Sequence, residues 1–242
     1  MDVAFAAYRD YSFSMMSLAE PYECADVRAY VPPANVKRLV VVASDRAHVP
    51  ELYAAGDVAL LSRRGVAIVG SREASPEGRL LAWQVARAVA ARGIVGVSGL
   101  ALGVDAAAHA GAMDAGGHTI AVIGTALDRA YPSAHARLQE VIYRDHLLVS
   151  PFAPGTPTTR GHFPARNRVM ARIADAIVLV EAGEKSGTGH ALREAVRLGR
   201  PVLVSERLFR GRGVGWVWEL AKNPGLRVWA TPSDVVRWLE DT

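Results

Sequence analysis

The sequence predicts an α/β protein built on a doubly wound, mostly parallel sheet. From Gly65 onward, short apolar runs rich in β-branched residues alternate with helical segments of about 10–15 residues, a pattern typical of successive βαβ units. Two of the apolar runs end at glycine-containing turns that lead into helices, Val66–Arg72 and Ser98–Asp105. Both turns are expected at the carboxyl ends of parallel strands, where sheets of this kind bind their ligands.

The strands and helices of this core are expected to alternate along the chain. Short apolar runs predict strands at 66–70, 94–98, 119–124, 146–150, 176–181 and 201–205. The segments between them predict helices at 76–92, 104–115, 134–144, 164–174 and 187–198. Pro76 stands in the first turn of one helix and Gly199 directly after another, the usual places for these residues. Helices at 211–221 and 232–240, with a strand at 227–230 between them, would close the domain.

The first 48 residues differ from the rest of the chain. They are rich in Tyr, Ser, Met and Pro and show neither a helical nor a strand period, although residues 38–43 could form one short strand. We therefore expect residues 1–48 to be an N-terminal extension that packs on a domain formed by residues 49–242. A short amphipathic helix at 50–62 is expected to lead into that domain.

Arginine carries most of the positive charge of the chain. Of the 28 basic residues 25 are arginine, because Lys37, Lys185 and Lys222 are the three lysines, and the formal net charge is +4. Arginine suits two-pronged contacts with phosphate and stacking on bases, which favours a nucleic-acid or nucleotide ligand. A general bias of composition towards alanine and arginine explains the same count equally well.

The single cysteine, Cys24, allows neither an internal disulfide nor a cysteine-rich zinc site. The N-terminus lacks the long apolar core of a secretory signal, and no apolar run approaches the ~18 residues of a membrane span. We therefore expect a soluble, cytoplasmic protein without a membrane partner. Half of the residues are hydrophobic, which is enough for a sizeable core.

The turn formed by Gly70, Ser71 and Arg72 is the first candidate site. A strand that ends in Gly-Ser before a helix exposes backbone amides at the helix N-terminus, and the Arg72 guanidinium could bind the same phosphate. The turn lacks both the dinucleotide-binding spacing Gly-x-Gly-x-x-Gly and the Gly-Lys-Ser/Thr of a Walker A loop. A tight turn with an incidental arginine is the alternative. The second turn would complete one cleft with Ser98, Gly99 and Gly103.

Asp105 and His109 lie four residues apart on one face of a predicted helix. They could form an acid–base or metal-binding pair. Alternatively, Asp105 is a carboxylate favoured by the helix dipole, and His109 is a polar residue between helix and sheet. Because no third ligand stands at a matching spacing, we assign no metal site and expect both residues to shape the cleft.

Arg166, Asn167 and Arg168 open a predicted helix after the polar loop 151–161. Cations at a helix N-terminus oppose the helix dipole, so ligand binding explains them better than stability does. We expect both arginines to contact phosphate and Asn167 to contact a base edge or the backbone. Arg72 and Arg166 are predicted to point into one cleft and to be dispensable for the fold.

Ser186, Gly187 and Thr188 form another flexible turn before a helix. Their hydroxyls and amides could hold phosphate at the rim of the same cleft. A solvated loop with a Ser/Thr helix cap is the alternative. We assign no catalytic residue and no cofactor from the sequence.

Several short motifs between residues 50 and 200 occur together, in the same order, in one protein family. They are Pro50–Tyr53 with Gly56, Val66–Arg72, Ser98–Asp105 with His109, Gly117–Gly124 with Leu127-Asp128 and Tyr131-Pro132, Phe163–Arg168, Val180–Ala182, Ser186-Gly187 and Gly199-Arg200. On these motifs the sequence resembles the DprA/Smf family of DNA-processing proteins. The resemblance implies an extended Rossmann fold, a basic pocket for single-stranded DNA, loading of the recombinase RecA, a role in natural transformation and a homodimer.

The sequence departs from the family pattern at both ends and at some internal positions. Residues 1–48 do not resemble the usual N-terminal helical domain, and no clear winged-helix domain precedes Thr242. Ser205-Glu206 stands where the family usually has Pro-Gly, and His135 where it usually has Asn. The resemblance therefore extends best to the core and to the sites at 70–72 and 166–168.

Two classes of function remain open. The first is a DNA-binding protein that assists recombination without catalysis. The second is a nucleotide-binding sensor or a phosphoribohydrolase-type enzyme on the same fold. Gly187-Thr188 matches part of the hydrolase motif Pro-Gly-Gly-x-Gly-Thr-x-x-Glu, but the Pro-Gly-Gly is absent and Glu194 lies too far along the chain. We therefore expect the first class, with single-stranded DNA as the partner.

Overall fold

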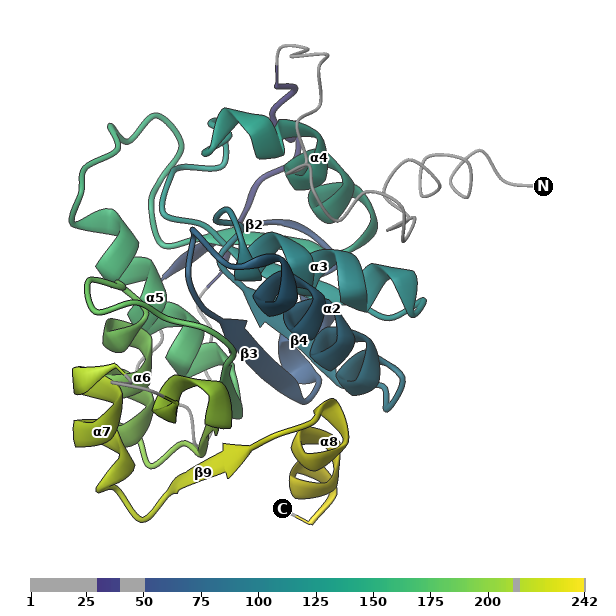
Figure 1. Ribbon diagram of the computed structural model, residues 1–242. Helices are drawn as coiled ribbons and strands as arrows, with labels where there is room; N and C mark the ends of the chain where they lie inside the picture. Colours follow the sequence, from purple (N-terminus) through teal and green to yellow (C-terminus); the bar gives the residue numbers. More distant parts are fainter. Residues whose placement is uncertain (1–29, 40–50, 211–213, 242) are drawn as a thin grey trace.

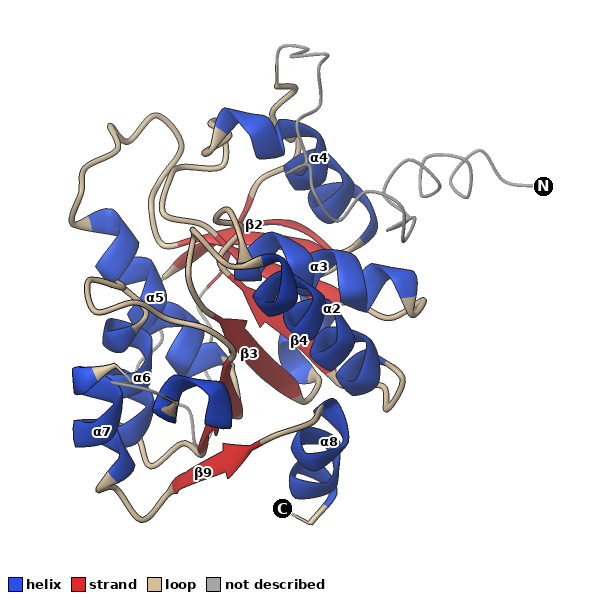
Figure 2. Ribbon diagram, viewed as in Figure 1, coloured by secondary structure: helices blue, strands red, loops and turns tan. Residues whose placement is uncertain are grey.

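A computed structural model of the chain describes residues 30–39, 51–210 and 214–241. In these residues nine strands form one sheet with helices packed on both faces (Figures 1 and 2). The strands are β1 (Lys37–Leu39), β2 (Leu52–Gly56), β3 (Gly65–Val69), β4 (Val95–Ser98), β5 (Thr119–Val122), β6 (Leu147–Ser150), β7 (Ala176–Leu179), β8 (Val202–Ser205) and β9 (Leu226–Trp229). The helices are α2 (Pro76–Ala90), α3 (Val104–Asp114), α4 (Ala136–Asp145), α5 (His162–Ile173), α6 (Gly189–Arg197), α7 (Gly215–Ala221) and α8 (Pro232–Glu240), with 3-10 turns η1 (Val58–Ser62), η2 (Ser133–His135) and η3 (Glu206–Phe209).

The order of the strands confirms the predicted doubly wound α/β fold. The sheet reads β1-β2-β6-β5-β4-β3-β7-β8-β9, and the seven strands from β6 to β9 are parallel. Within the parallel part of the sheet, the chain runs from β3 outward through β4, β5 and β6, and then crosses back to place β7, β8 and β9 on the other side of β3. This reversal creates a switch point beside β3, and open α/β sheets bind ligands at the carboxyl ends of the strands there.

Buried side chains on alternate strand positions divide the core into two layers. Val66 and Ile68 of β3 face one layer, which is covered by α2, α3 and α8. Ala67 and Val69 face the other layer, which is covered by α5, α6 and α7. Figure 1 shows these two groups of helices on opposite sides of β3. All five residues of this strand are buried, so β3 is anchored from both faces, and the turn that follows it starts from a rigid element.

The expected helix at 50–62 is wrong in its first half. Residues 52–56 form β2, which pairs antiparallel with β6 in the register Tyr53↔Ser150, and a 3-10 turn at 58–62 follows. The Leu-Tyr-Ala-Ala sequence favours a helix locally, but pairing with a strand about ninety positions further along overrides that preference. Leu52 and Ala54 are thereby fully buried in the core.

Near the two ends of the chain, the structure describes part of the predicted elements. Within the predicted 38–43 strand, β1 includes Arg38 and Leu39 and pairs antiparallel with β2, while residues 40–43 lie outside the described ranges. The proposed extension at 1–48 is described for residues 30–39 alone. The two closing helices and the strand between them are present as α7, β9 and α8. Among the described helices, none combines the length and apolar character required to span a bilayer.

Candidate nucleic-acid interface

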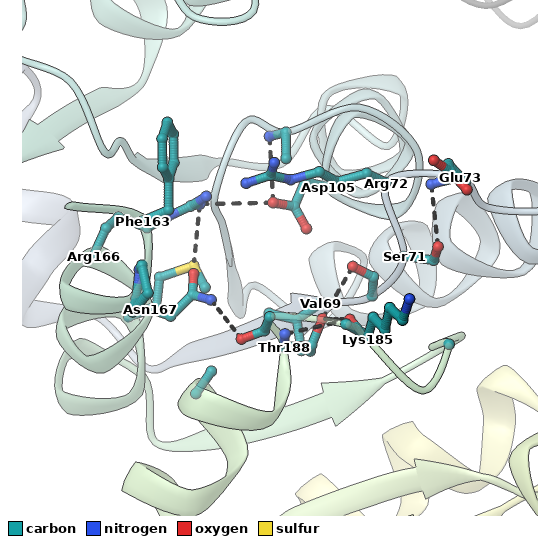
Figure 3. A pocket seen from close by; sticks show the side chains of 18 of the residues that line it. Val69, Ser71, Arg72, Glu73, Asp105, Phe163, Arg166, Asn167, Lys185 and Thr188 are labelled. Carbon is teal, nitrogen blue, oxygen red and sulfur yellow. Dashed lines mark hydrogen bonds and ion pairs between the residues drawn. The ribbon is translucent and has the colours of Figure 1, made fainter. Parts of the chain in front are cut away.

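A pocket of about 730 Å³ opens at the carboxyl ends of β3, β4 and β7 (Figure 3). Its walls come from the β3–α2 turn, the β4–α3 turn, the loop before η2, the start of α5 and the β7–α6 loop. The lining residues are Val69, Gly70, Ser71, Arg72, Glu73, Ala101, Asp105, Tyr131, Arg160, Phe163, Pro164, Arg166, Asn167, Met170, Gly183, Lys185, Ser186, Gly187, Thr188 and Ala191. Arg72 and Arg166 both line this one pocket, as predicted, whereas Ser98, Gly99 and Gly103 do not line it.

Close backbone packing explains the glycines of the two turns. A Cβ on Gly70 would lie 2.5 Å from Val104 Cγ2 and 2.7 Å from the Glu181 carbonyl oxygen. Gly103 has a φ of +76°, and a Cβ there would overlap the Ser71 carbonyl, which accepts a hydrogen bond of 3.2 Å from the Val104 amide. These glycines therefore bring the β3 and β4 turns together; Gly70 also lines the pocket.

The N-terminus of α2 already holds a carboxylate of the chain itself. Ser75 donates to Glu181 through its amide (2.8 Å) and its hydroxyl (2.6 Å), and the same hydroxyl accepts from the Gly78 amide. The Ser71 amide donates to the Glu181 carbonyl at 2.7 Å. Glu181 thus occupies the position favoured by the helix dipole, and the amides of Ser71 and Ser75 are engaged within the fold. The predicted contact of the 70–72 turn with phosphate stays a prediction.

Arg72 remains an exposed cation at this pocket. Its guanidinium carbon lies 5.2 Å from the centroid of the Phe163 ring, which is within cation–π distance. Tyr131 and Phe163 form an aromatic wall of the pocket, since their ring centroids are 5.2 Å apart, and half of the tyrosine is exposed. A charged group, the half-exposed Tyr131 ring and the partly exposed Phe163 ring thus stand side by side.

Arg166 differs from Arg72 because it is buried and paired. It is 4% exposed, donates to the Val122 carbonyl at 3.1 Å and lies 3.7 Å from Asp105 Oδ2 (Figure 3). Burial raises the pKa of Asp105, an effect that the Arg166 guanidinium opposes, and burial lowers the pKa of Arg166. A Cβ on Gly99 would overlap this guanidinium. This buried pairing leads us to expect that Arg166 contributes to the fold, contrary to the sequence-based expectation that it is dispensable.

The helix that carries Arg166 also begins earlier than predicted. Because α5 starts at His162, residues 166–168 lie in its second turn and not at the dipole end. Asn167 donates its amide to the Gly187 carbonyl at 3.1 Å, so it ties α5 to the β7–α6 loop. Arg168 is exposed but does not line the pocket.

The turn at 186–188 lines the pocket and is internally bonded. The hydroxyls of Ser186 and Thr188 lie 2.7 Å apart, and the Thr188 hydroxyl donates to the Gly70 carbonyl at 3.2 Å. These contacts join the β7–α6 loop to the β3–α2 turn. Ser98, by contrast, is buried away from the pocket and donates to the Ile68 carbonyl at 2.7 Å, so its role is structural.

His109 does not contribute to the pocket. It is fully buried, with Nδ1 2.7 Å from the Thr119 hydroxyl, and burial lowers its pKa to about 3. The imidazole is therefore neutral, and its pairing with Asp105 as acid and base is wrong. Among the described residues, His, Cys, Asp and Glu side chains form no group of three that could hold a metal ion.

Two exposed cations of the pocket were not predicted, Arg160 and Lys185. Arg160 lies just before α5 and Lys185 in the β7–α6 loop, so each precedes a motif that the sequence did single out. A signal was present, because Lys185 is one of only three lysines in the chain. Together with Arg72 these residues place positive charge on three separate walls of the pocket.

The model of the family described as DNA recombination-mediator protein A matches residues 33–225. The chain belongs to this family. The DNA processing protein DprA of Streptococcus pneumoniae is 42% identical over 151 residues, which cover 62% of this chain and 53% of that protein. Protein Smf of Escherichia coli is 35% identical over 152 residues, covering 62% and 41%. The chain thus spans about half the length of the curated DprA relatives it matches.

Solved DprA structures share the fold. The structure of DprA from S. pneumoniae superimposes with a TM-score of 0.71 at 36% identity, covering 77% of this chain and 65% of that one. A DprA structure from Helicobacter pylori, described in terms of its single-stranded DNA binding mode, has a TM-score of 0.74 at 28% identity and covers 85% and 96%. A molybdenum cofactor binding protein from Rippkaea orientalis, at 18% identity and a TM-score of 0.55, is similar in fold alone.

Proposed function

We propose that this DprA-family protein binds single-stranded DNA in the pocket and acts in DNA processing during recombination, without a catalytic step. One observation carries the proposal. Three exposed cations, Arg72, Arg160 and Lys185, line the pocket together with the half-exposed ring of Tyr131 and the partly exposed ring of Phe163. Proteins that bind single strands combine these two elements, a cationic groove for the phosphates and aromatic faces on which bases stack.

The aromatic wall favours single strands over duplex. In a duplex the faces of the bases are stacked on one another and are not accessible to a protein side chain. An unpaired base can stack on Tyr131 or Phe163, and such stacking is worth about 1–3 kcal/mol per base. We expect little sequence preference, because every base offers a ring face and phosphate contacts carry no sequence information.

A titration with fluorescent oligo-dT across salt concentrations tests this proposal. If the three exposed cations each neutralise one phosphate, log affinity falls with log salt with a slope of about −2 on single strands. A duplex of the same length serves as the control and is expected to bind more weakly. Salt-independent binding, or equal affinity for the duplex, would count against the proposed function.

A nucleotide sensor or phosphoribohydrolase is the second candidate, and the comparisons do not favour it. The same titration with mononucleotides, together with an assay for base release from nucleoside monophosphates, separates the candidates. Binding of a mononucleotide as tight as that of oligo-dT, or release of base, would support the alternative.

The family also leads us to propose RecA as a protein partner, a homodimer, a cytoplasmic location and a role in natural transformation. Sedimentation of the purified protein measures the oligomeric state. RecA loading is tested by the rate at which RecA displaces single-strand-binding protein from DNA in the presence and absence of this protein. An unchanged rate would refute the RecA partnership while leaving DNA binding intact.

A further inference from the structure

Tyr30, which precedes the core, has both hydrogen-bonding functions of its hydroxyl engaged. The hydroxyl donates to the Leu127 carbonyl at 2.8 Å and accepts from Gln139 Nε2 at 2.8 Å. Its burial raises its pKa, so the phenol stays protonated and remains a donor. The hydroxyl therefore links an N-terminal segment to α4 and to the β5–η2 loop (residues 123–132).

The next residue along the segment is held on α4 as well. The Val31 amide donates to Glu140 Oε1 at 3.1 Å, and the Tyr143 hydroxyl donates to the Val31 carbonyl at 3.0 Å. These two bonds fasten the segment to the helix but do not reach the β5–η2 loop. Tyr30 is thus the point at which the segment meets that loop.

Several hydrogen bonds hold the β5–η2 loop: Ser150 donates to the Thr125 carbonyl, the Gly155 amide donates to the Asp128 carboxylate, and two further carbonyls are held near Tyr30. Tyr30 binds the Leu127 carbonyl, and the Arg129 carbonyl accepts from Gln139 Nε2 at 3.3 Å and from the Thr125 hydroxyl at 3.0 Å. The side-chain amide of Gln139, which is fully buried, donates both to the Tyr30 hydroxyl and to the Arg129 carbonyl of the loop. Loss of the Tyr30 hydroxyl would remove one of the loop anchors and one partner of a buried amide.

This loop carries Tyr131 to the pocket. Tyr131 packs against Phe163, and Phe163 in turn lies under the guanidinium of Arg72. Both aromatic residues and Arg72 line the pocket. A continuous path of contacts therefore runs from Tyr30 through the loop to the groups that would hold a base and a phosphate.

We propose that Tyr30 is a positioning residue for the DNA pocket, which fixes the β5–η2 loop so that Tyr131 stands against Phe163. The inference rests on the proposed binding of single-stranded DNA. Without the Tyr30 hydroxyl the loop populates conformers in which Tyr131 leaves the aromatic wall. Affinity then falls in proportion to the fraction of protein that keeps the binding-competent arrangement.

Tyr30→Phe keeps the ring and removes both hydrogen bonds of the hydroxyl. The matched control is Tyr143→Phe, which removes a tyrosine hydroxyl of α4 that binds the same segment at the Val31 carbonyl and does not contact the loop. The first readout needs no DNA: exposed Arg129 lies in the loop, so trypsin cleavage after it reports how often the loop opens. We expect cleavage at Arg129 to accelerate about three- to tenfold in Tyr30→Phe, the scale of one net hydrogen bond, and to be unchanged in the control.

The second readout is the affinity for fluorescent oligo-dT in the full-length protein. We expect Tyr30→Phe to weaken binding about three- to tenfold, and Tyr143→Phe to match the parent. In a Tyr131→Ala background, Tyr30→Phe should cause no further loss, because the residue that it positions is gone. A merely structural role would instead give the same fold-loss in both backgrounds.

The possible outcomes distinguish a failure of this inference from a failure of the proposed function. Cleavage at Arg129 equal in Tyr30→Phe and the parent, or an additive loss of affinity in the Tyr131→Ala background, overturns the positioning role. If the parent binds oligo-dT and Tyr30→Phe binds it equally well, this inference fails and the proposed function stands. If the parent itself binds no oligo-dT, the proposed function fails, and the rate of cleavage at Arg129 still decides whether Tyr30 anchors the loop.

Discussion

Replacing Arg166 tests whether the floor of the pocket is a structural ion pair. Arg166→Met removes the guanidinium and keeps most of the apolar volume of the side chain. Asp105, of which 8% of the side chain is exposed, would lose the cation 3.7 Å away. Breaking a buried pair by removing one partner costs about 3–5 kcal/mol of unfolding free energy, since a buried charge remains uncompensated.

The loss should depend on pH, and its sign follows from Asp105. Burial raises the pKa of this carboxyl in the folded protein even with Arg166 present, and the pKa rises further without the guanidinium. A carboxyl with a raised folded pKa binds its proton more tightly in the fold, so stability falls as the pH rises through that pKa. The difference between Arg166→Met and the parent should therefore shrink towards acidic pH, by up to about 1.4 kcal/mol per pH unit.

Urea unfolding at pH 8, 7, 6 and 5 measures the difference between variant and parent. Adding Asp105→Asn to Arg166→Met removes the uncompensated charge and should recover part of the lost stability at pH 7. If Arg166→Met alone unfolds at the same urea concentration as the parent at pH 7, the reasoning is refuted. A loss of stability that neither acidic pH nor Asp105→Asn reduces would refute it too.

Three further predictions concern other parts of the molecule. Arg72→Ala should weaken oligo-dT binding by about 1–3 kcal/mol in an anisotropy titration and leave the melting temperature unchanged, whereas Lys222→Ala should change neither; a large fall in melting temperature for Arg72→Ala would make that arginine structural. His109 has its folded pKa lowered to about 3, so stability is full above pH 6.5 and declines as the pH falls below it; His109→Asn should flatten this decline in urea midpoints between pH 7 and 5, and an unaltered decline would contradict the assignment. Glu181→Ala should lower the free energy of unfolding by about 1–3 kcal/mol, because it removes both bonds to the Ser75 cap; equal thermal stability of variant and parent would show that the cap is redundant.

The alternation of strands and helices was predictable because its signals are local. Apolar runs of strand length such as 94–98, and punctuating residues such as Pro76 and Gly199, act within a few positions of themselves. The strand at 52–56 was not predictable, since Leu52 and its neighbours are good helix formers, and their partner β6 lies far along the chain.

The site, too, could be predicted only where its signals are local in the sequence. Arg72 follows a strand directly, so its place at the pocket could be derived from sequence order alone. The burial of Arg166 depends on Asp105, about sixty positions away, and the cap on α2 depends on Glu181, about a hundred positions from Ser75. No local pattern marks such pairs, and cations that appear to seek a ligand can therefore prove to be paired within the fold.

The carboxylate of Glu181 at the start of α2 has a consequence for the length of DNA that the proposed binding pocket would retain. If no carboxylate occupied the N-terminus of α2, its backbone amides could bind one phosphate strongly, and a single nucleotide would then suffice for binding. Here that place is filled, so in the proposed binding mode the attraction would come from the cations that line the pocket, Arg72, Arg160 and Lys185. Occupancy should accordingly show a threshold in oligonucleotide length: short fragments released by nucleases would leave quickly, and strands long enough to engage all three cations at once would stay.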